Sequence, residues 1–436
     1  MTTATVRLWG RDIGAVSQDA DRALCHFEYD PAFRRSGIEV APLTMPLSDR
    51  IWSFPALAHE TYQGLPGLLA DSLPDDFGNA LIDAWLARQG RAPDTFNAVE
   101  RLCYIGVRGM GALEYAPAAG PFRNRSAEVD VAALVDLASE ILTRRNRLSG
   151  SLLPDEREET LLDILRVGTS AGGARAKAII AWNRETGEVR SGQVAAGDGF
   201  TYWLLKFDGV SGNRDKELED PAGYGLIEYA YYLMALEAGI TMNECRLLQE
   251  QGRNHFMTRR FDRTDSGGKI HMQTLCAMAH FDYRRPGAYS YEQALQVIRE
   301  LGLPMEDVEE QFRRMTFNII GRNQDDHVKN IAFLMDRSGR WSLSPAYDMT
   351  YSHNPAGAWT STHQMSLGGK RDHFVLEDFR ACAALASMKR GRAEEIVREV
   401  HAAIARWPQF AEQAGVAEDE MRRIRNAQRL DIIQAA

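Results

Sequence analysis

An acidic loop, a predicted β-hairpin and a further aspartate follow one another in this 436-residue chain, and they constrain its fold more than any other feature. Asp325 and Asn330 lie in the loop with the spacing D-x-x-x-x-N. The apolar segment Ile331–Met335 and, after an Asp-Arg-Ser-Gly turn, the segment Trp341–Leu343 are predicted strands. Asp348 follows the second strand. Because the two ends of a hairpin lie side by side, we expect the loop and Asp348 to share one site.

The chemistry that such a loop supports is phosphoryl transfer. D-x-x-x-x-N is the spacing of the catalytic loop of protein kinases, where an acid orients the substrate hydroxyl and oxygen ligands hold Mg²⁺ on the phosphates. The pattern predicts that Asp325 takes or orients the substrate hydroxyl. It predicts that Asn330 and Asp348 bind Mg²⁺, and that Lys329 neutralises the charge of the transferring phosphoryl group. The alternative without a function is a solvated turn, because the D-x-x-x-x-N pattern alone also occurs by chance. His327, inside the loop, is either a base or metal ligand or a structural prop, and the structural role is favoured.

A segment rich in small residues lies upstream and is the candidate phosphate-binding loop. Val167–Arg175 contains Gly168, Gly172 and Gly173 and precedes the predicted strand Ala178–Trp182. Glycines let the backbone approach phosphate closely, so that successive N–H groups can surround it. The segment has neither the P-loop pattern nor the G-x-G-x-x-G of ordinary protein kinases. A plain glycine turn between strands is therefore the alternative.

Lys206 is the candidate lysine for the ATP phosphates. It is the one lysine of a mostly apolar predicted strand, Thr201–Phe207, and a lysine buried in a strand needs an anion to offset its desolvation. A lysine whose stem runs along an edge strand into water is the alternative. Glu228 lies in the predicted helix Gly225–Ala238. It either pairs with Lys206 or, as is favoured, lies in the first turn, where the helix dipole favours an acid.

Taken together, these residues resemble the HipA family of bacterial serine/threonine kinases, the toxins of HipBA-type toxin–antitoxin modules. The resemblance covers nearly the whole chain. Its motifs are individually weak but specific in combination, and they are Gly64 to Asp75, Gly109 to Tyr115, Ser170-Ala171-Gly172-Gly173-Ala174-Arg175-Ala176-Lys177, Leu205-Lys206, Arg260-Phe261-Asp262-Arg263, Asp325 to Asn330, and Tyr347-Asp348.

The resemblance implies ATP and Mg²⁺ as cofactors and gives several residues a role. Arg259 to Phe261 match the hinge whose backbone contacts adenine, so Arg259 and Phe261 are candidate ATP-binding residues. Ser170 matches the serine of the glycine loop that family members autophosphorylate, which ejects the loop and silences the kinase. Thr169 offers a second hydroxyl beside it. Asp326 departs from the family, in which a small residue is usual after the catalytic aspartate. As an acid one residue away it is a rival candidate for the base, although the D-x-x-x-x-N spacing favours Asp325.

Composition sets the remaining bounds. A formal net charge of −9 disfavours unaided binding to nucleic acid. The five cysteines are scattered and form no C-x-x-C, which indicates reduced thiols and no zinc site. No apolar run reaches membrane-spanning or signal-peptide length, so we expect a cytoplasmic protein with no membrane partner. The length predicts two or three compact units.

The predicted fold is α+β and two-lobed like a protein kinase, with an amino-terminal, β-rich accessory subdomain. We expect the accessory subdomain at 1–118, a strand-rich lobe with the glycine loop and lysine at 128–262, and a helical lobe with the catalytic loop at 263–436. Strands are predicted at Val6–Gly10 and Leu24–Tyr29. Apolar spacing predicts the helices Asp76–Leu86, Ala127–Leu142, Ser290–Leu301, Met305–Ile320, Leu376–Ala384 and Arg392–Trp407.

The function expected from this resemblance is an ATP- and Mg²⁺-dependent serine/threonine protein kinase of the HipA type. By family precedent its substrate is a cytosolic protein such as an aminoacyl-tRNA synthetase. Its partner is a HipB-like helix-turn-helix antitoxin, and the protein contacts DNA only through this antitoxin. Two alternatives remain: a small-molecule phosphotransferase, and a catalytically dead kinase fold that acts as a scaffold or co-repressor.

Overall fold

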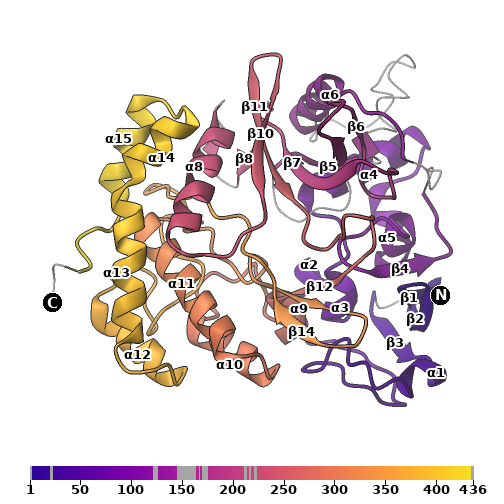
Figure 1. Ribbon diagram of the computed structural model, residues 1–436. Helices are drawn as coiled ribbons and strands as arrows, with labels where there is room; N and C mark the ends of the chain where they lie inside the picture. The colour runs from indigo at the N-terminus through magenta and orange to yellow at the C-terminus, as the bar shows by residue number, and fades with distance from the viewer. Residues whose placement is uncertain are drawn as a thin grey trace. The chain divides into compact units, whose positions relative to one another are not determined.

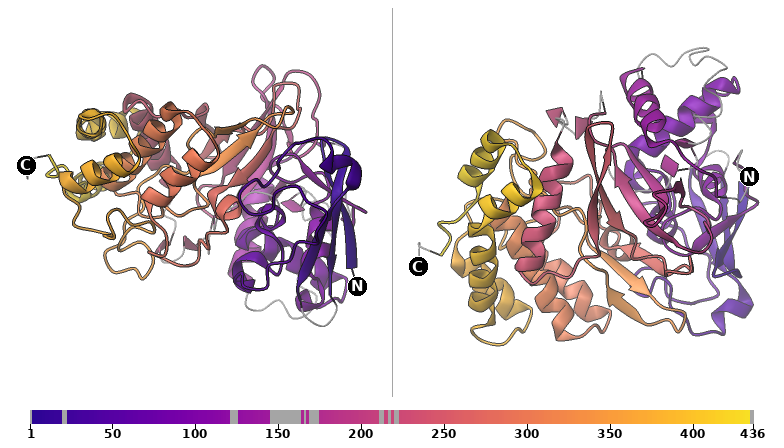
Figure 2. Two further views of the ribbon diagram at one scale, coloured as in Figure 1. Left: turned by 90° about the horizontal axis from the view of Figure 1, so that it is seen from below. Right: turned by 45° about the horizontal axis from the view of Figure 1, so that its top comes forward.

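The computed structural model describes residues 2–19, 23–120, 126–144, 164–165, 167–168, 175–210, 214–215, 218–219 and 223–433 (Figures 1 and 2). It contains both helices and sheets, so the predicted mixture of α and β structure is confirmed. The chain divides into two compact units. The first unit comprises Met1–Ala222, Leu248–Gln273 and Leu334–Arg340, and the second comprises Gly223–Leu247, Thr274–Phe333 and Trp341–Ala436.

The first unit begins with an antiparallel sheet in the strand order β3-β2-β1-β4. Its strands are β1 (Thr2–Leu8), β2 (Arg11–Gln18), β3 (Cys25–Tyr29) and β4 (Leu113–Ala116). Trp9 and Gly10 both have positive φ, 51° and 78°, as a two-residue hairpin turn requires. The prediction of a strand through Gly10 is therefore wrong, because the chain turns at these two residues.

A second sheet carries the candidate ATP lysine and has the order β10-β11-β7-β5-β6. Its strands are β5 (Lys177–Asn183), β6 (Val189–Ser191), β7 (Phe200–Lys206), β10 (Cys245–Glu250) and β11 (Arg253–Arg259). The predicted strands around residues 180 and 204 are confirmed to within one residue. Two further sheets are small, one of β8 (Arg214–Asp215) and β9 (Leu218–Glu219), the other in the order β12 (His271–Thr274), β13 (Ala332–Met335), β14 (Trp341–Leu343).

The helices described in the first unit are α1 (Pro31–Arg34), α2 (His59–Tyr62), α3 (Gly67–Ala70), α4 (Asp76–Arg88), the 3-10 helix η1 (Pro93–Thr95), α5 (Ala98–Ile105) and α6 (Val131–Arg144). Side chains of α4, α6, β5 and β7 form one core cluster. Helix α6 begins four residues later than predicted, because Ala127 and Val129 lie extended beside β6. Their backbones pair with Ser191 and Val189 at 2.8 and 3.0 Å.

The second unit is mostly helical, as predicted for the carboxy-terminal part. Its described helices are α8 (Tyr224–Glu237), α9 (Leu275–Ala279), α10 (Tyr291–Glu300), α11 (Met305–Gly321), α12 (Leu376–Leu385), α13 (Arg392–Ala405), α14 (Trp407–Ala414) and α15 (Glu418–Ala427). Helix α11 packs against α13, and α8 against α14 (Figures 1 and 2). The predicted helix Arg392–Trp407 is confirmed as α13 to within two residues. A separate helix, α14, begins at Trp407, because Pro408 occupies its first turn, where a continuing helix could not accommodate it.

Two further observations concern the cysteines and the apolar character of the helices. All five cysteines are free and buried. Within the part of the chain that the structure describes, no helix combines the length and the apolar character needed to cross a membrane.

Candidate active site

The D-x-x-x-x-N segment forms a compact loop between α11 and β13 in the second unit. Helix α11 ends at Arg322, whose left-handed backbone, φ 60°, turns the chain into the loop. The backbone N–H of His327 donates to the carbonyl of Asp325 at 2.9 Å, and that of Asn330 donates to His327 at 2.8 Å. The side-chain amide of Asn330 also donates to the Asp325 carbonyl, at 2.9 Å. These bonds bring Asp325 and Asn330 together, as the spacing predicts.

The hairpin β13–β14 returns the chain to this loop. Tyr347 donates its hydroxyl to the carbonyl of Lys329 at 2.5 Å, which fastens the residue before Asp348 to the loop. The carbonyl of Asp348 accepts from the side chain of Asn323 at 3.3 Å. Asp348 itself has a φ of 57°, a left-handed conformation that aspartate tolerates better than most residues and that often marks functional sites.

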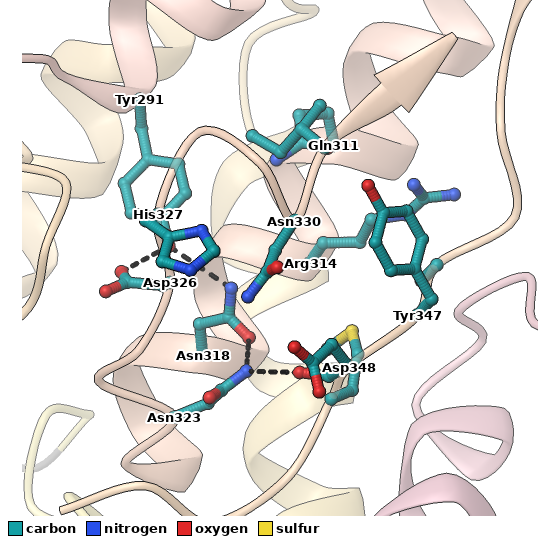
Figure 3. Close-up of a pocket in the computed structure, with 13 residues that line it drawn as sticks. Tyr291, Gln311, Arg314, Asn318, Asn323, Asp326, His327, Asn330, Tyr347 and Asp348 are labelled. Atoms are coloured by element: carbon teal, nitrogen blue, oxygen red, sulfur yellow. Dashed lines mark hydrogen bonds between the residues drawn. The ribbon is translucent and has the colours of Figure 1, made fainter. Parts of the chain in front are cut away.

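A pocket in the second unit contains Asn330 and Asp348 (Figure 3). Figure 3 shows both side chains beside Asn323 and Asn318, which are joined by a hydrogen bond of 3.0 Å. The lining residues are Tyr291, Gln311, Arg314, Asn318, Asn323, Asp326, His327, Asn330, Ile331, Ala346, Tyr347, Asp348 and Met349. The structure therefore brings the two predicted metal ligands into one polar pocket.

Asp326, the acid next to Asp325, is a buried structural residue. Its carboxylate accepts hydrogen bonds from the Tyr291 hydroxyl at 2.5 Å, the His363 Nδ1 at 2.7 Å and the backbone N–H of Gln364 at 2.7 Å. Burial alone would raise the pKa of Asp326, but the interactions with His363, Tyr291 and Gln364 outweigh burial and lower it. With 2% exposure and these three bonds, Asp326 is not available to a substrate hydroxyl.

The other polar residues of the loop have defined surroundings. The ring of His327 packs edge-on against Tyr283, with centroids 5.5 Å apart, and its Nε2 lies 3.9 Å from Oδ1 of Asp325. The ammonium of Lys329 lies 4.5 Å from the centroid of Tyr283. The indole N–H of Trp359 donates to Oδ1 of Asp325 at 2.6 Å. The hydrogen bond from Trp359 thus holds one of the two oxygens, Oδ1, of the proposed catalytic carboxylate.

Those predicted ATP-binding residues that the structure describes lie in the first unit. Lys206 ends β7, directly opposite Lys177 of β5, and its ammonium lies 5.8 Å from the centroid of Phe256. Lys177 itself is buried and pairs with Asp75 at 3.1 Å. Burial raises the pKa of Asp75 to about 6, although Lys177 opposes this shift.

Some of the other predicted ATP-binding residues also lie in the part of the chain that the structure describes. Gly168 is buried against α4, where an added Cβ would lie 2.6 Å from a methyl carbon of Leu81. Packing therefore explains this glycine. Arg259 ends β11 and pairs with Asp265, and Phe261 is half-buried. Thr169, Ser170, Gly172 and Gly173 lie outside the described residues.

Glu228 differs from the interpretation favoured by its sequence. It lies beyond the first turn of α8, which contains no acid, and it is 1% exposed. The prediction of a first-turn glutamate interacting with the helix dipole is wrong, because Glu228 is the fifth residue of the helix.

Comparison with models of known protein families shows the family of this chain. Residues 4–116 match the family model described as the HipA N-terminal domain, and residues 169–407 match the HipA-like C-terminal domain. The second match alone spans more than half of the chain. The protein belongs to the HipA family. A comparison with curated proteins finds no match.

Solved structures agree with the HipA assignment at the level of the fold. HipA in the complex of the Shewanella oneidensis toxin–antitoxin system, with HipB and operator DNA, has a TM-score of 0.66 and 17% identity to this chain. The match covers 97% of this chain and 95% of that one. The Helicobacter pylori proinflammatory kinase CtkA matches with a TM-score of 0.34 and 11% identity, over 54% of this chain and 90% of that one, a similarity from which we conclude nothing.

The donor set of this HipA protein suits a hard cation. Asn330 donates its amide N–H to the Asp325 carbonyl, which leaves its oxygen as the atom that could coordinate, and Asp348 supplies a carboxylate in the same pocket. Among the described residues, no group of three or more His, Cys, Asp or Glu side chains could hold a metal ion by itself. Mg²⁺ commonly takes only one or two protein oxygens and completes its shell with waters and phosphates, so the residues fit this ion.

Sequence reasoning missed the residues that hold the loop from outside. Trp359, His363 and Gln364 contact Asp325 and Asp326, and Arg429 donates to Nε2 of His363 at 2.9 Å. These partners lie 34 or more residues from the loop along the chain. No local pattern links them to it, and only their contacts in the fold reveal them.

Proposed function

We propose that this protein is an ATP- and Mg²⁺-dependent serine/threonine protein kinase, and a HipA-type toxin. The observation that supports it best is the pocket containing Asn330 and Asp348, next to a loop in which Asn330 also fastens Asp325. Membership of the HipA family supports the same conclusion.

The residues have the following roles in the proposed reaction. Asp325 accepts the proton of a serine or threonine hydroxyl while that oxygen bonds to the γ-phosphorus, and the bond from phosphorus to the β,γ-bridging oxygen breaks to release ADP. Asn330 and Asp348 hold Mg²⁺, which neutralises charge on the phosphates. Lys206 pairs with the phosphates, and Lys329 offsets the charge of the transferring group. The backbone at Arg259 to Phe261 contacts adenine, and the glycine loop surrounds the phosphates.

The partners are also proposals. A HipB-like helix-turn-helix antitoxin is supported by the match to a HipA solved with HipB and operator DNA, and DNA is contacted only through that antitoxin. The substrate is a cytosolic protein, for which the family precedent is an aminoacyl-tRNA synthetase. Phosphorylation of Ser170 within the glycine loop silences the enzyme, because about −1.5 to −2 added charges repel the ATP phosphates.

Asp325→Asn tests the assignment. The amide keeps the shape of the side chain but cannot accept a proton, so ADP formation from Mg²⁺-ATP should fall on the order of 10²- to 10⁴-fold. Calorimetry should show ATP binding that is largely intact. Asp336→Asn, in the exposed turn between β13 and β14, is the matched control and should keep the wild-type rate. A wild-type rate in Asp325→Asn, or no ADP formation by the wild type, contradicts the proposal.

The same reaction mixtures test the regulatory site. Mass spectrometry of wild-type protein incubated with Mg²⁺-ATP should find phosphate on Ser170 and none in the Asp325→Asn variant. Phosphate on Thr169 alone, or on neither residue in an active enzyme, shows that the switch is misplaced.

A further inference from the structure

Trp359 makes the shortest described contact to the proposed catalytic carboxylate. Its indole N–H donates to Oδ1 of Asp325 at 2.6 Å. Around the same residue, His327 Nε2 is 3.9 Å from Oδ1, and the amide of Asn330 holds the main-chain carbonyl. The contact is one of the direct restraints on how the side chain of Asp325 points, and it comes from a neutral donor.

The segment that carries Trp359 is itself fixed to the catalytic loop. The side-chain amide of Gln364 donates to the carbonyl of Trp359 and to that of Gln324, the latter at 3.2 Å. The backbone N–H of Gln364 donates to Asp326. Gln364 is 4% exposed and Gln324 is fully buried. The backbone of Trp359 is therefore held by the same residues that shape the loop, and this places its indole within reach of Asp325.

We propose that Trp359 is a positioning residue for phosphoryl transfer, which holds Oδ1 of Asp325 so that Oδ2 receives the substrate hydroxyl. The inference rests on the proposed kinase function. A carboxylate has two oxygens, and a donor on one fixes the rotation of the group and directs the other. The indole is uncharged, so it directs the carboxylate without competing for the phosphates.

Trp359→Phe tests the proposal because phenylalanine keeps an aromatic ring and removes only the donor and the second ring. Loss of a hydrogen bond to a charged group should lower the rate of ADP formation at saturating Mg²⁺-ATP by roughly ten- to a hundredfold. The dissociation constant of ATP should stay within about twofold, since Trp359 acts on the carboxylate and not on the nucleotide. Trp341→Phe, in β14, removes an indole N–H elsewhere in the second unit and should change neither the rate nor the dissociation constant.

The outcomes separate this inference from the proposed function. If Asp325→Asn is inactive while Trp359→Phe keeps the wild-type rate, the positioning role is overturned and the kinase assignment stands. If Trp359→Phe is faster than the wild type, the indole blocks the carboxylate and the positioning role is also overturned. If Asp325→Asn keeps the wild-type rate, the kinase assignment itself fails. Unfolding in urea, followed by circular dichroism, confirms that a slow Trp359→Phe variant is folded.

Discussion

Two buried carboxylates, Asp262 in the first unit and Asp326 in the second, are both almost inaccessible to water but are stabilised in different ways. Asp262 accepts from the guanidinium groups of Arg260 and Arg263 at 2.7 to 2.8 Å, and from the backbone N–H of Gly111 at 2.7 Å. Burial alone would raise the pKa of Asp262, but the two arginines outweigh it and hold the pKa well below its usual range.

Asp326 has neutral donors instead of direct cations. Its contact with Nδ1 of His363, together with the bond from Arg429 to Nε2, requires the neutral histidine with its proton on Nδ1. Arg429 in turn donates to Asp372 at 2.6 Å. Asp262 therefore joins residues 109–111 to residues 260–263, whereas Asp326 stands beside the proposed base. The difference predicts that the first cluster contributes mainly to stability and the second to both stability and catalysis.

Asp262→Ala should give the largest loss of stability. The substitution leaves two buried guanidinium groups without their counter-charge, which typically costs on the order of 3–5 kcal/mol. The free energy of unfolding is measured in urea, with circular dichroism and tryptophan fluorescence as independent probes. The rate of ADP formation per folded molecule should stay near that of the wild type. A fall in that rate as large as the one found for an Asp326 variant would remove the distinction between the clusters.

Asp326→Asn should give a smaller loss of stability and a clear loss of activity. The amide weakens the bonds from Tyr291 and His363 to a charged acceptor, which should cost about 2–3 kcal/mol. The neighbouring carboxylate of Asp325 should also shift, so we expect the rate at saturating ATP to fall by roughly tenfold or more at little change in ATP affinity. Rate and affinity are measured at a temperature where both variants are folded. The comparison fails if Asp326→Asn is destabilised but turns over ATP like the wild type.

The same two clusters show what the sequence could and could not predict. Asp262 and both of its arginines lie within four residues, so the motif is visible in the sequence even though its role is not. The predicted strands β5, β7, β13 and β14 and the long helices of the second unit follow from periodicity and turn residues, which are local. D-x-x-x-x-N followed by a hairpin also predicted that Asn330 and Asp348 share a site, because a hairpin fixes where its ends lie.

What the sequence did not reveal depends largely on contacts that are distant in sequence. Nothing near Asp326 indicates that its partners are Tyr291, His363 and Gln364, which lie 35 to 38 residues away. Asp326 therefore read as a rival base one residue from Asp325, whereas its burial makes it structural. Gly168 suits a phosphate loop by residue type, yet it packs against α4. The segment at 127–130 is part of a predicted helix whose apolar spacing begins at Val131, but it is extended and held by backbone pairing with β6.

Lowering the pH should also distinguish the two clusters, by a change in the free energy of unfolding that is smaller than the effects of the two substitutions above. Burial lowers the pKa of His363; Asp326 opposes this shift, and Arg429 and Arg322 add to it. As pH falls below about 6.5, the unfolded chain therefore takes up a proton that folded His363 resists, and stability declines. Asp262 has a depressed pKa, so its contribution is present above about 3.8 and is lost only below that value. Between pH 7 and 5 only the second cluster should respond.

His363→Asn isolates this contribution, because it removes the titrating ring while other groups titrate as before. The difference in unfolding free energy between wild type and His363→Asn should shrink as pH falls from 7 to 5, since the wild type alone loses the contribution of a neutral His363. Over the same range, the difference between wild type and Asp262→Ala should stay constant. A constant difference for His363→Asn would mean that His363 takes up its proton equally in the folded and unfolded chains. A difference that grows towards pH 5 would mean that the ring is protonated in the folded protein, and that Arg429 does not donate to its Nε2.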